Sequence, residues 1–482
     1  MNSPQTPTRT ASPSKALPDA VVVSLYAAQE KIYPRSISGF FTKWRWVMIW
    51  LTQLFFYGVP WLAWGQRQAL LFDLEAKRFY IFNLVLYPQD LIYLTAILII
   101  SALSLFLFTA VAGRLWCGYA CPQTVYTEIF LWIERKVEGD RAARMKLDAS
   151  ETSSKKLLKK GTKHFIWIAF ALWTGFTFVG YFTPIRELAK EFTQLNVSPW
   201  ETFWVCFYGF ATYGNAGFMR EQVCKYMCPY ARFQSAMFDD DTLVVTYDEA
   251  RGEPRGGRSR KADNDSHKLG SCIDCSLCVQ VCPTGIDIRK GLQYECIGCG
   301  ACADVCDTVM DKMGYARGLV KYSTQNAITQ HWSQKQMLQR ILRPRVIIYA
   351  TILVLLTSGL LVSLWLRTPF RVDVVRDRGV MARLVDGGML ENVYRLQIMN
   401  GTETTQHYRL NASGLKDLAI ELDGAEVNQS ITVKPTESRW ISVRLEIPDG
   451  SVESGSHHVQ FEIQSLESKE TVTEKSVFLV PR

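Results

Sequence analysis

The chain has 482 residues, of which 48% are hydrophobic and 12% aromatic, and it carries a formal net charge of +8. It is long enough for several domains, and this share of apolar and aromatic residues is typical of a membrane protein that also carries soluble parts. No basic patch is interleaved with aromatic residues that would stack on bases, so we predict that nucleic acid is not a partner.

Five apolar runs dominate the chain after residues 1–30, which we predict to be a disordered cytoplasmic tail rich in Ser, Thr, Pro and Ala. Each run is near the roughly 20 residues that cross a bilayer as a helix. The predicted spans are about 46–64, 90–112, 165–183, 200–218 and 346–366. The first four and their loops form an expected transmembrane domain at 31–240, which the fifth completes. The fourth contains Glu201 and Asn215, so an interfacial or re-entrant segment is its alternative interpretation.

Two C-x3-C-P motifs follow the second and the fourth runs. They hold Cys117, Cys121 and Pro122 in the first motif, and Cys224, Cys228 and Pro229 in the second. Proline disfavours helical dihedral angles in the residue before it and favours the first turn of a new helix. We therefore expect a helix break with a thiol at each motif, followed by a short helix along the membrane surface. Thiolates select Cu(I), zinc or iron–sulfur centres, while four unrelated buried cysteines are the structural alternative.

Residues 241–345 contain two cysteine runs with the spacing C-x2-C-x2-C-x3-C. In this bacterial ferredoxin pattern, three close thiolates and the fourth cysteine of the other run hold one cubane 4Fe–4S cluster. The predicted ligands are Cys272, Cys275, Cys278 and Cys306 for one cluster, and Cys296, Cys299, Cys302 and Cys282 for the other. Zinc sites usually join cysteine pairs from separated knuckles, so structural zinc is the weaker interpretation. We expect an α+β, two-cluster ferredoxin-like insert that transfers electrons.

Two further segments are distinguished by composition. Residues 249–268 are rich in Gly, Arg and Asp, which predicts a mobile loop before the cluster domain, or alternatively a basic contact with the inner leaflet. Residues 367–482 contain alternating segments such as 393–399 and 458–463, separated by turn signals such as Asn400-Gly401. About seven short strands over roughly 110 residues indicate an all-β, immunoglobulin-like sandwich. We predict that it docks a partner.

The distribution of basic residues predicts the orientation in the membrane. Residues 113–164 hold eleven Lys or Arg, whereas the loops after the first and third spans hold few. Five crossings with a cytoplasmic N-terminus place the ferredoxin-like insert in the cytoplasm and the C-terminal domain in the periplasm. Clustered thiolates independently require a reducing compartment for the insert.

These features resemble those of the cytochrome oxidase accessory proteins called CcoG, FixG or RdxA. The resemblance covers nearly the whole chain from Lys31, and it is carried by residues 31–35, the two C-x3-C-P motifs, both ferredoxin runs and the terminal sandwich. It implies a multi-pass protein of the bacterial inner membrane that reduces Cu(II) to Cu(I) during assembly of the cbb-type oxidase. The implied cofactors are two 4Fe–4S clusters, with copper as substrate or transient ligand. The implied catalytic thiols are those of Cys117, Cys121, Cys224 and Cys228.

The same resemblance implies the partners, which are membrane lipid, a copper chaperone or copper transporter, the oxidase assembly machinery and an unidentified electron donor. Other interpretations stay open. The C-x3-C-P motifs also resemble those of NapH and NosR proteins, so a quinol-oxidising relay is one alternative, although the sequence shows only His164 near a span and no helix-borne histidine pair. A non-catalytic scaffold with redox-sensing clusters is another. A third iron–sulfur centre at the four C-x3-C-P cysteines is also compatible with the sequence.

Overall fold

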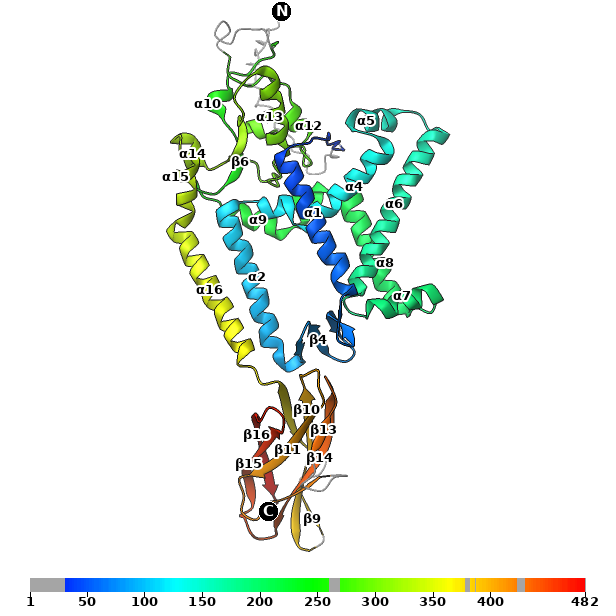
Figure 1. Cartoon of the computed structure of the whole chain (residues 1–482), viewed down its shortest axis with the longest axis vertical. Helices are drawn as coiled ribbons and strands as arrows, with labels where there is room; N and C mark the ends of the chain where they lie inside the picture. Colours follow the sequence, from blue (N-terminus) through cyan, green and yellow to red (C-terminus); the bar gives the residue numbers. More distant parts are fainter. Residues whose placement is uncertain (1–30, 260–268, 378–381, 386, 423–429, 482) are drawn as a thin grey trace, which may run out of the picture.

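The computed structural model describes residues 31–259, 269–377, 382–385, 387–422 and 430–481. The predicted tail at 1–30 and part of the predicted mobile loop, 260–268, lie outside the described residues. Figure 1 shows an elongated molecule with the cysteine-rich insert at one end, the C-terminal β domain at the other, and long helices between them.

Two long apolar helices, α2 (Leu91–Ala112) and α16 (Pro344–Trp365), lie side by side between the two ends. A short turn, η2 (Pro88–Asp90), precedes the first of them. Within the described residues, these are the two helices that are long and apolar enough to cross a membrane. The expectation of five such helices is therefore met only in part.

The other three predicted spans are helices with more polar or shorter sequences. They are α1 (Phe40–Gly58), α6 (Ser154–Val179) and α8 (Pro199–Gly214). Helix α1 starts before its predicted position and includes Arg45, which the sequence suggested was part of a basic flank. Arg45 is buried, and its Nη1 lies 3.1 Å from Oε2 of Glu128. Helix α1 ends early because the turn η1 (Val59–Trp61), which contains Pro60, follows directly. Helix α8 stops at Gly214, where the chain widens into the π-helical turns η3 (Asn215–Met219) and η4 (Val223–Met227).

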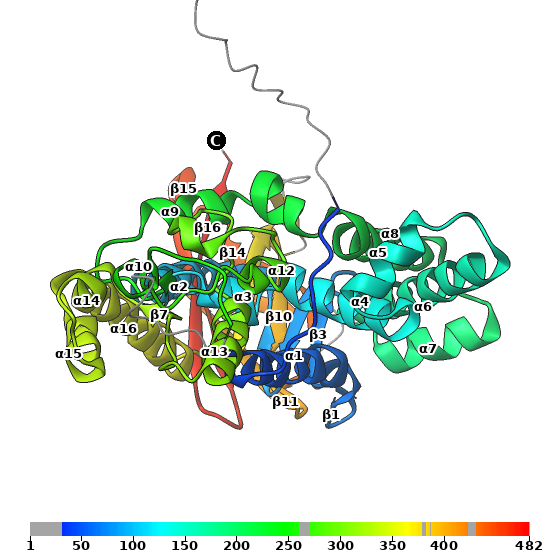
Figure 2. The same cartoon turned by 90° about the horizontal axis from the view of Figure 1, so that it is seen from above.

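Short helices lie across the ends of the long helices, beneath the insert (Figures 1 and 2). They are α3 (Leu115–Tyr119), α4 (Pro122–Glu138) and α9 (Pro229–Ala236). Helices α4 and α9 each begin at the proline of a C-x3-C-P motif, as the sequence predicts. Two further helices, α5 (Arg141–Ala149) and α7 (Ile185–Gln194), flank α6.

The insert is α+β. Its two strands, β6 (Val244–Tyr247) and β7 (Val320–Ser323), pair antiparallel. Its helical segments are α10 (Glu249–Gly252), α12 (Leu277–Gln280), η5 (Ile288–Lys290), α13 (Ala301–Met313), α14 (Gln325–Thr329), α15 (Gln334–Gln339) and η6 (Arg340–Leu342). In the described part of the predicted mobile loop, the short helix α10 forms and Ser271 N donates to Arg251 O at 2.8 Å.

Buried polar contacts join the insert to α1. The Asp304 carboxylate on α13 accepts hydrogen bonds from Phe41 N at 3.1 Å, from Thr42 N at 2.8 Å and from Thr42 Oγ1 at 2.7 Å. The first N–H groups of a helix lack partners within it, so Asp304 serves as the cap that the sequence around Gly39 does not supply. The cluster domain is thus attached to the end of a long helix by a carboxylate from a distant part of the chain.

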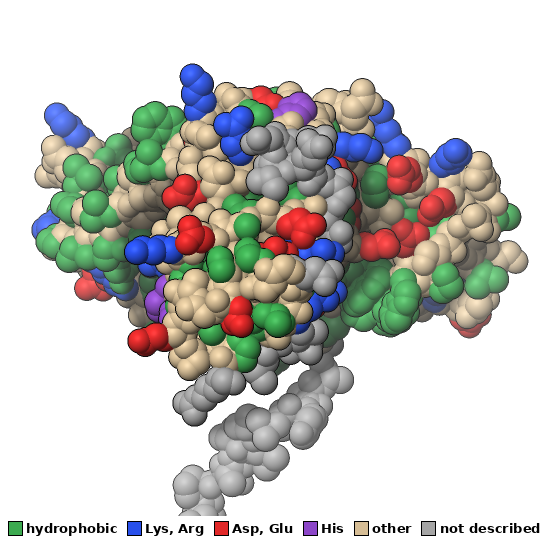
Figure 3. Space-filling model, turned by 90° about the horizontal axis from the view of Figure 1, so that it is seen from below, with side chains coloured by type: hydrophobic (Ala, Val, Ile, Leu, Met, Phe, Trp, Pro, Cys, Tyr) green, Lys and Arg blue, Asp and Glu red, His purple; other side chains and the backbone are tan. Residues whose placement is uncertain are grey.

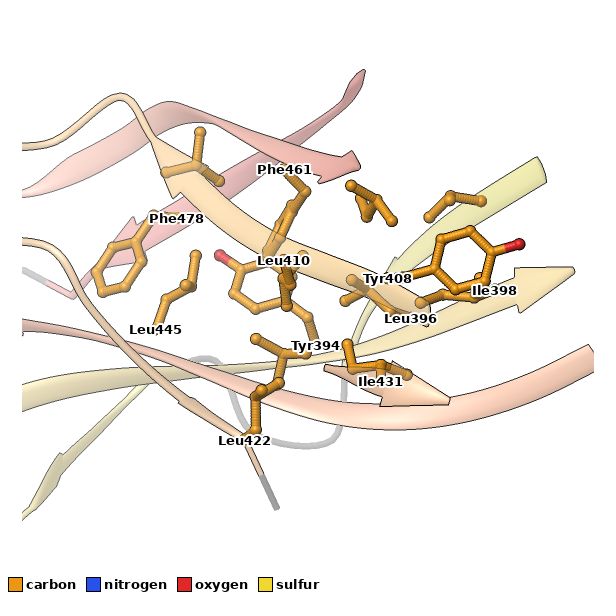
Figure 4. Close-up of a cluster of buried hydrophobic side chains, with 14 of the residues drawn as sticks. Tyr394, Leu396, Ile398, Tyr408, Leu410, Leu422, Ile431, Leu445, Phe461 and Phe478 are labelled. Atoms are coloured by element: carbon orange, nitrogen blue, oxygen red, sulfur yellow. The ribbon is translucent and has the colours of Figure 1, made fainter. Parts of the chain in front are cut away.

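The C-terminal domain is a sandwich of two antiparallel sheets. One sheet has the order β12-β14-β10-β8 with β9 beside β10, and the other has the order β13-β11-β15-β16. The strands are β8 (Phe370–Arg376), β9 (Arg383–Val385), β10 (Met389–Asn400), β11 (Gln406–Ser413), β12 (Ala419–Leu422), β13 (Ile431–Val433), β14 (Ser438–Pro448), β15 (Gly455–Ser465) and β16 (Thr471–Val480). Apolar side chains from both sheets meet in the core shown in Figure 4, where the rings of Tyr394 and Phe461 lie 5.1 Å apart.

A small β region that the sequence analysis did not foresee connects the sandwich to the long helices. Its strands are β1 (Ala63–Trp64), β2 (Arg67–Gln68), β3 (Leu70–Asp73), β4 (Arg78–Ile81) and β5 (Leu84–Leu86). The Tyr87 hydroxyl donates to Asn400 O at 2.8 Å, and the buried carboxylate of Asp90 pairs with Arg367 at 2.6 Å and Arg371 at 3.2 Å. Seen from the sandwich, hydrophobic side chains gather on both flanks of the molecule (Figure 3).

Candidate functional site

The eight cysteines of the ferredoxin runs surround two small cavities in the insert. One cavity, of about 30 Å³, is lined by Cys272, Cys275, Cys278 and Cys306, which we call the outer quartet. The other, of about 20 Å³, is lined by Cys282, Cys296, Cys299 and Cys302, the inner quartet, and also by Cys278. The fourth cysteine of each run therefore lies with the first three of the other run, in the crosswise arrangement that the spacing predicts.

The chemistry of these residues fits cubane iron–sulfur clusters. The backbone turns around the inner quartet at Gly298 and Gly300, whose φ angles are +64° and +74°, and Gly298 N donates to Cys296 Sγ at 3.4 Å. Burial raises the pKa of Cys296 and of Cys306 to about 12. Thiols whose pKa is raised in this way need a positively charged centre to exist as thiolates at neutral pH, and iron supplies it.

The four C-x3-C-P cysteines, Cys117, Cys121, Cys224 and Cys228, form a second group that we call the four-thiol site. Electrostatic interactions link Cys121 to each of the other three thiols. All four cysteines are half-buried. In the part of the chain that the structure describes, no three of these sulfur atoms lie within 4.8 Å of one another. The arrangement therefore suits either one ion held by a pair of thiols or a larger centre held by all four.

Two of these thiols lie at helix starts. Cys121 is the residue before α4 and Cys228 is the residue before α9. Burial raises the pKa of Cys121, and hydrogen bonds from the backbone N–H groups of Thr124 and Gln123 oppose that rise. Free N–H groups at a helix start favour negative charge. These two positions therefore stabilise the thiolate that forms when a bound metal ion displaces the thiol proton.

The other two thiols depend on residues that the sequence analysis did not assign to a site. The Cys117 thiol donates to Oε1 of the fully buried Gln234 at 3.5 Å, and Gln234 Nε2 donates to Gly113 O at 3.0 Å. Burial raises the pKa of Cys117 to about 12 and that of Cys224 to about 11, and the positive charge of Arg114 opposes both shifts. The one local signal for these residues was their closeness to the motifs in sequence.

The four-thiol site and the inner quartet are in direct contact. Cys117 packs in the same apolar cluster as Ile297 and Cys299. Between the two cysteines of the first motif, Gly118 lies against the inner quartet: an added Cβ atom would be 2.8 Å from Gly298 O and 3.0 Å from Cys299 Cα. Because electron transfer slows steeply with distance, this contact provides a short path between the two sites.

Comparisons with known protein families agree with this geometry. Residues 219–325 match a family model described as a 4Fe-4S dicluster domain, and residues 94–138 match one described as a 4Fe-4S binding domain. Residues 360–481 match the model for the immunoglobulin-like fold at the C-terminus of FixG. The predictions of ferredoxin-type iron–sulfur domains and of an immunoglobulin-like C-terminal domain are thus confirmed. The match over 94–138 also includes Cys117 and Cys121.

Three curated proteins are similar over most of the chain. The nitrogen fixation protein FixG of Rhizobium meliloti is 34% identical over 461 residues, which are 88% of this chain and 88% of FixG. Protein RdxB of Cereibacter sphaeroides is 39% identical over 84% of this chain and 87% of its own length. Protein RdxA of the same organism is 36% identical over 89% of this chain and 91% of its own length.

Proposed function

The chain belongs to the FixG/RdxA family of iron–sulfur proteins, and from this premise we propose that it is a cupric reductase of the bacterial inner membrane, acting in assembly of a cbb-type oxidase. In this proposal, electrons pass from a cytoplasmic donor through the outer and inner quartets to Cu(II) at the four-thiol site. The observation that carries it is the contact between Gly118 of the first C-x3-C-P motif and the backbone of residues 297–299.

The route is set by exposure and contact. Cys275 is exposed, so the outer quartet is the side that a donor protein reaches. Cys278 lines both small cavities and brings the two quartets together. Each cluster, when bound, supplies a store for one electron. The approach of Gly118 to Cys299, with Cys117 packed against the same apolar cluster, then provides the path for the electron to the four-thiol site.

The proposed reaction balances with one electron for each copper ion. Cu(II) binds as the thiols lose their protons to water, and it takes one electron to become Cu(I). Soft thiolates select Cu(I) over Cu(II), so binding to sulfur favours the reduction. When Cu(I) leaves for a chaperone or a transporter, the buried thiols regain their protons, because burial raises the pKa of Cys117 and Cys224 to about 12 and about 11.

The proposed membrane arrangement adds α1, α6 and α8 to the two apolar helices as a five-helix domain. The insert is then cytoplasmic and the C-terminal sandwich is periplasmic, where it docks a partner of the assembly machinery. Basic residues such as Lys155, Lys156 and Lys159 near the start of α6 support this orientation, since Lys and Arg favour the cytoplasmic side.

The experiment starts from protein that is purified without oxygen, reduced with dithionite and freed of excess reductant. Cu(II) is then added together with a Cu(I)-specific chromophore. We expect Cu(I) in proportion to the reduced clusters, and a large loss in the quadruple variant with Cys117, Cys121, Cys224 and Cys228 changed to Ala. Cys206→Ala is the matched control, because Cys206 is an exposed cysteine on α8 outside both sites. An unchanged yield of Cu(I) from the quadruple variant would refute the proposal.

A third iron–sulfur centre is the second candidate for the four-thiol site. It is favoured by the 4Fe-4S binding model that covers Cys117 and Cys121. Iron analysis of anaerobic protein separates the two candidates. If the four thiols hold a cubane cluster, the quadruple variant contains about four iron atoms fewer for each chain. If they hold copper, the iron content of the variant equals that of the unmodified protein.

A quinol-oxidising relay is the alternative function that a specific observation favours. A mostly apolar cavity of about 320 Å³ lies among α1, α4, α6 and α8, and its wall includes Ala120 and Pro122 on either side of Cys121. Among the described atoms, the buried Oε1 of Gln53 in this wall accepts no hydrogen bond. A quinol hydroxyl would supply the missing donor. Under this alternative, a quinol analogue reduces the clusters and is itself oxidised to the quinone with loss of two electrons and two protons. A non-catalytic scaffold protein would show neither this reaction nor copper reduction.

A further inference from the structure

Arg114 lies buried between the inner quartet and the four-thiol site. It follows α2 directly after Gly113, and only 6% of its surface is exposed. Its Nη1 donates to Cys296 O at 3.2 Å, and its Nη2 donates to Ala231 O on α9 at 2.8 Å. One guanidinium group therefore contacts both the loop of the inner quartet and the helix that follows the second C-x3-C-P motif.

The charge of Arg114 has no carboxylate partner at ion-pair distance among the described residues. Other deeply buried arginines are paired: Arg45 with Glu128, Arg144 with Glu134, and Arg343 with Asp239. The strongest favourable electrostatic interactions of Arg114 are instead with Cys117, then Cys296 and Cys224, ahead of Glu295. An unpaired buried charge is costly, so sulfur at the two neighbouring sites is its natural counter-charge.

Packing keeps Arg114 in place and away from water. The backbone of Gly298 lies against it, since an added Cβ atom would be 3.2 Å from the carbonyl carbon and oxygen of Arg114. The ring of Phe238 lies 5.9 Å from the guanidinium carbon. The buried Nε–H has no hydrogen-bond partner among the described atoms, which leaves one donor for a group bound at either site. A charge in such a dry position acts more strongly on its neighbours than it would in water.

We propose that Arg114 acts electrostatically on both sites: its positive charge raises the reduction potential of the cluster at the inner quartet and stabilises a Cu(I)–thiolate complex at Cys117 and Cys224. The copper half of this proposal rests on the proposed function, whereas the cluster half does not.

The test is an oxygen-free redox titration of the full-length protein, followed by electron paramagnetic resonance with no copper added. In Arg114→Gln we expect one of the two cluster reduction steps to move to lower potential while the other stays in place. Arg114→Lys keeps the charge and should retain most of the original potential. Arg289→Gln is the matched control, because Arg289 interacts with Cys278 of the outer quartet and is paired with Asp287 at 2.8 Å. It should leave the step that Arg114 controls unchanged.

A second measurement uses competition with a chromophoric chelator to compare Cu(I) affinity between the same variants. A nearby opposite charge shifts an equilibrium between charge states about 10-fold or more, and we expect a loss of Cu(I) affinity of at least about 10-fold for Arg114→Gln. Iron content that matches the unmodified protein shows that the variant has folded and loaded its clusters. If neither step moves, or if both move equally, the effect of Arg114 on the inner cluster is refuted. Unchanged Cu(I) affinity refutes its effect on the four-thiol site. A shifted step in a protein that forms no Cu(I) would refute the cupric reductase while leaving the effect of Arg114 on the cluster intact.

Discussion

Gly118 and Gly298 meet backbone to backbone, and an added Cβ atom on Gly118 would lie 2.8 Å from the carbonyl oxygen of Gly298. The first glycine lies between Cys117 and Cys121, and the second lies between Cys296 and Cys299 of the inner quartet. Two cysteine motifs far apart in the sequence are thus in contact because Gly118 has no side chain. This contact, together with the hydrogen bond from Arg114 to Cys296 O, links the iron–sulfur insert to the four-thiol site.

Gly118→Ala should weaken that link without removing any cysteine. The added methyl group must move one backbone away from the other, and a misplacement of about 1 Å can slow a reaction roughly 100-fold. We expect unchanged iron content and copper reduction slowed about 10- to 100-fold. Gly161→Ala on α6 is the control, because nothing lies within 4 Å of the position of its added Cβ atom. Equal rates in both variants would show that the contact is not on the electron path.

Asp304→Asn should loosen the attachment of the insert to α1. The carboxylate accepts hydrogen bonds from Phe41 N, Thr42 N and Thr42 Oγ1, and an amide side chain offers only one oxygen to these donors. Hydrogen bonds to a buried charged group contribute about 1.5–3 kcal/mol each, so the free energy of unfolding should fall by about that amount. Limited proteolysis and thermal unfolding measure the change. Asp311→Asn on the same helix, where the carboxylate is exposed and pairs with Arg317, should leave both readouts nearly unchanged.

The thiols of the four-thiol site should show an unusual pH dependence when no metal is bound there. An ordinary cysteine has a pKa of about 8.5, whereas burial raises that of Cys117 to about 12. Since only the thiolate reacts, alkylation of Cys117 by iodoacetamide should rise about tenfold for each pH unit from about pH 8 to 11, with no plateau. The same shift stabilises the fold below about pH 8.5, and this contribution is lost as the pH rises toward the folded pKa. Mass spectrometry of the Cys117 peptide measures the reaction, and a plateau near pH 9 would contradict the shift.

Features that depend on local spacing could be predicted from the sequence. The cysteine spacing alone groups Cys306 with Cys272 and Cys282 with Cys296, because in the ferredoxin pattern the fourth cysteine of each run lies with the first three of the other run. Proline after cysteine likewise predicts the starts of α4 and α9. The resemblance to the FixG and RdxA proteins, which such motifs carried, is confirmed by relatives that cover most of the chain.

Features that depend on contacts between distant residues could not be predicted. The start of α1 is set by Asp304, which is more than 260 positions away along the chain. Arg114 and Gln234 gain their importance from burial next to the thiols, which no local pattern reveals. The boundaries of α1 were misplaced for the same reason. Apolar composition alone excluded Arg45 from the helix, whereas Arg45 lies within α1 and forms a buried ion pair with Glu128.

The most direct test of the electron path follows both of its ends in one rapid-mixing experiment without oxygen. Pre-reduced protein is mixed with Cu(II), and the loss of the reduced iron–sulfur signal is recorded together with the formation of Cu(I). We expect the two changes to occur at the same rate and in equal amounts, and both to be largely lost in the variant lacking the thiols of Cys117, Cys121, Cys224 and Cys228. Cu(I) that forms at an unchanged rate in that variant, or clusters that stay reduced while Cu(I) appears, would contradict it.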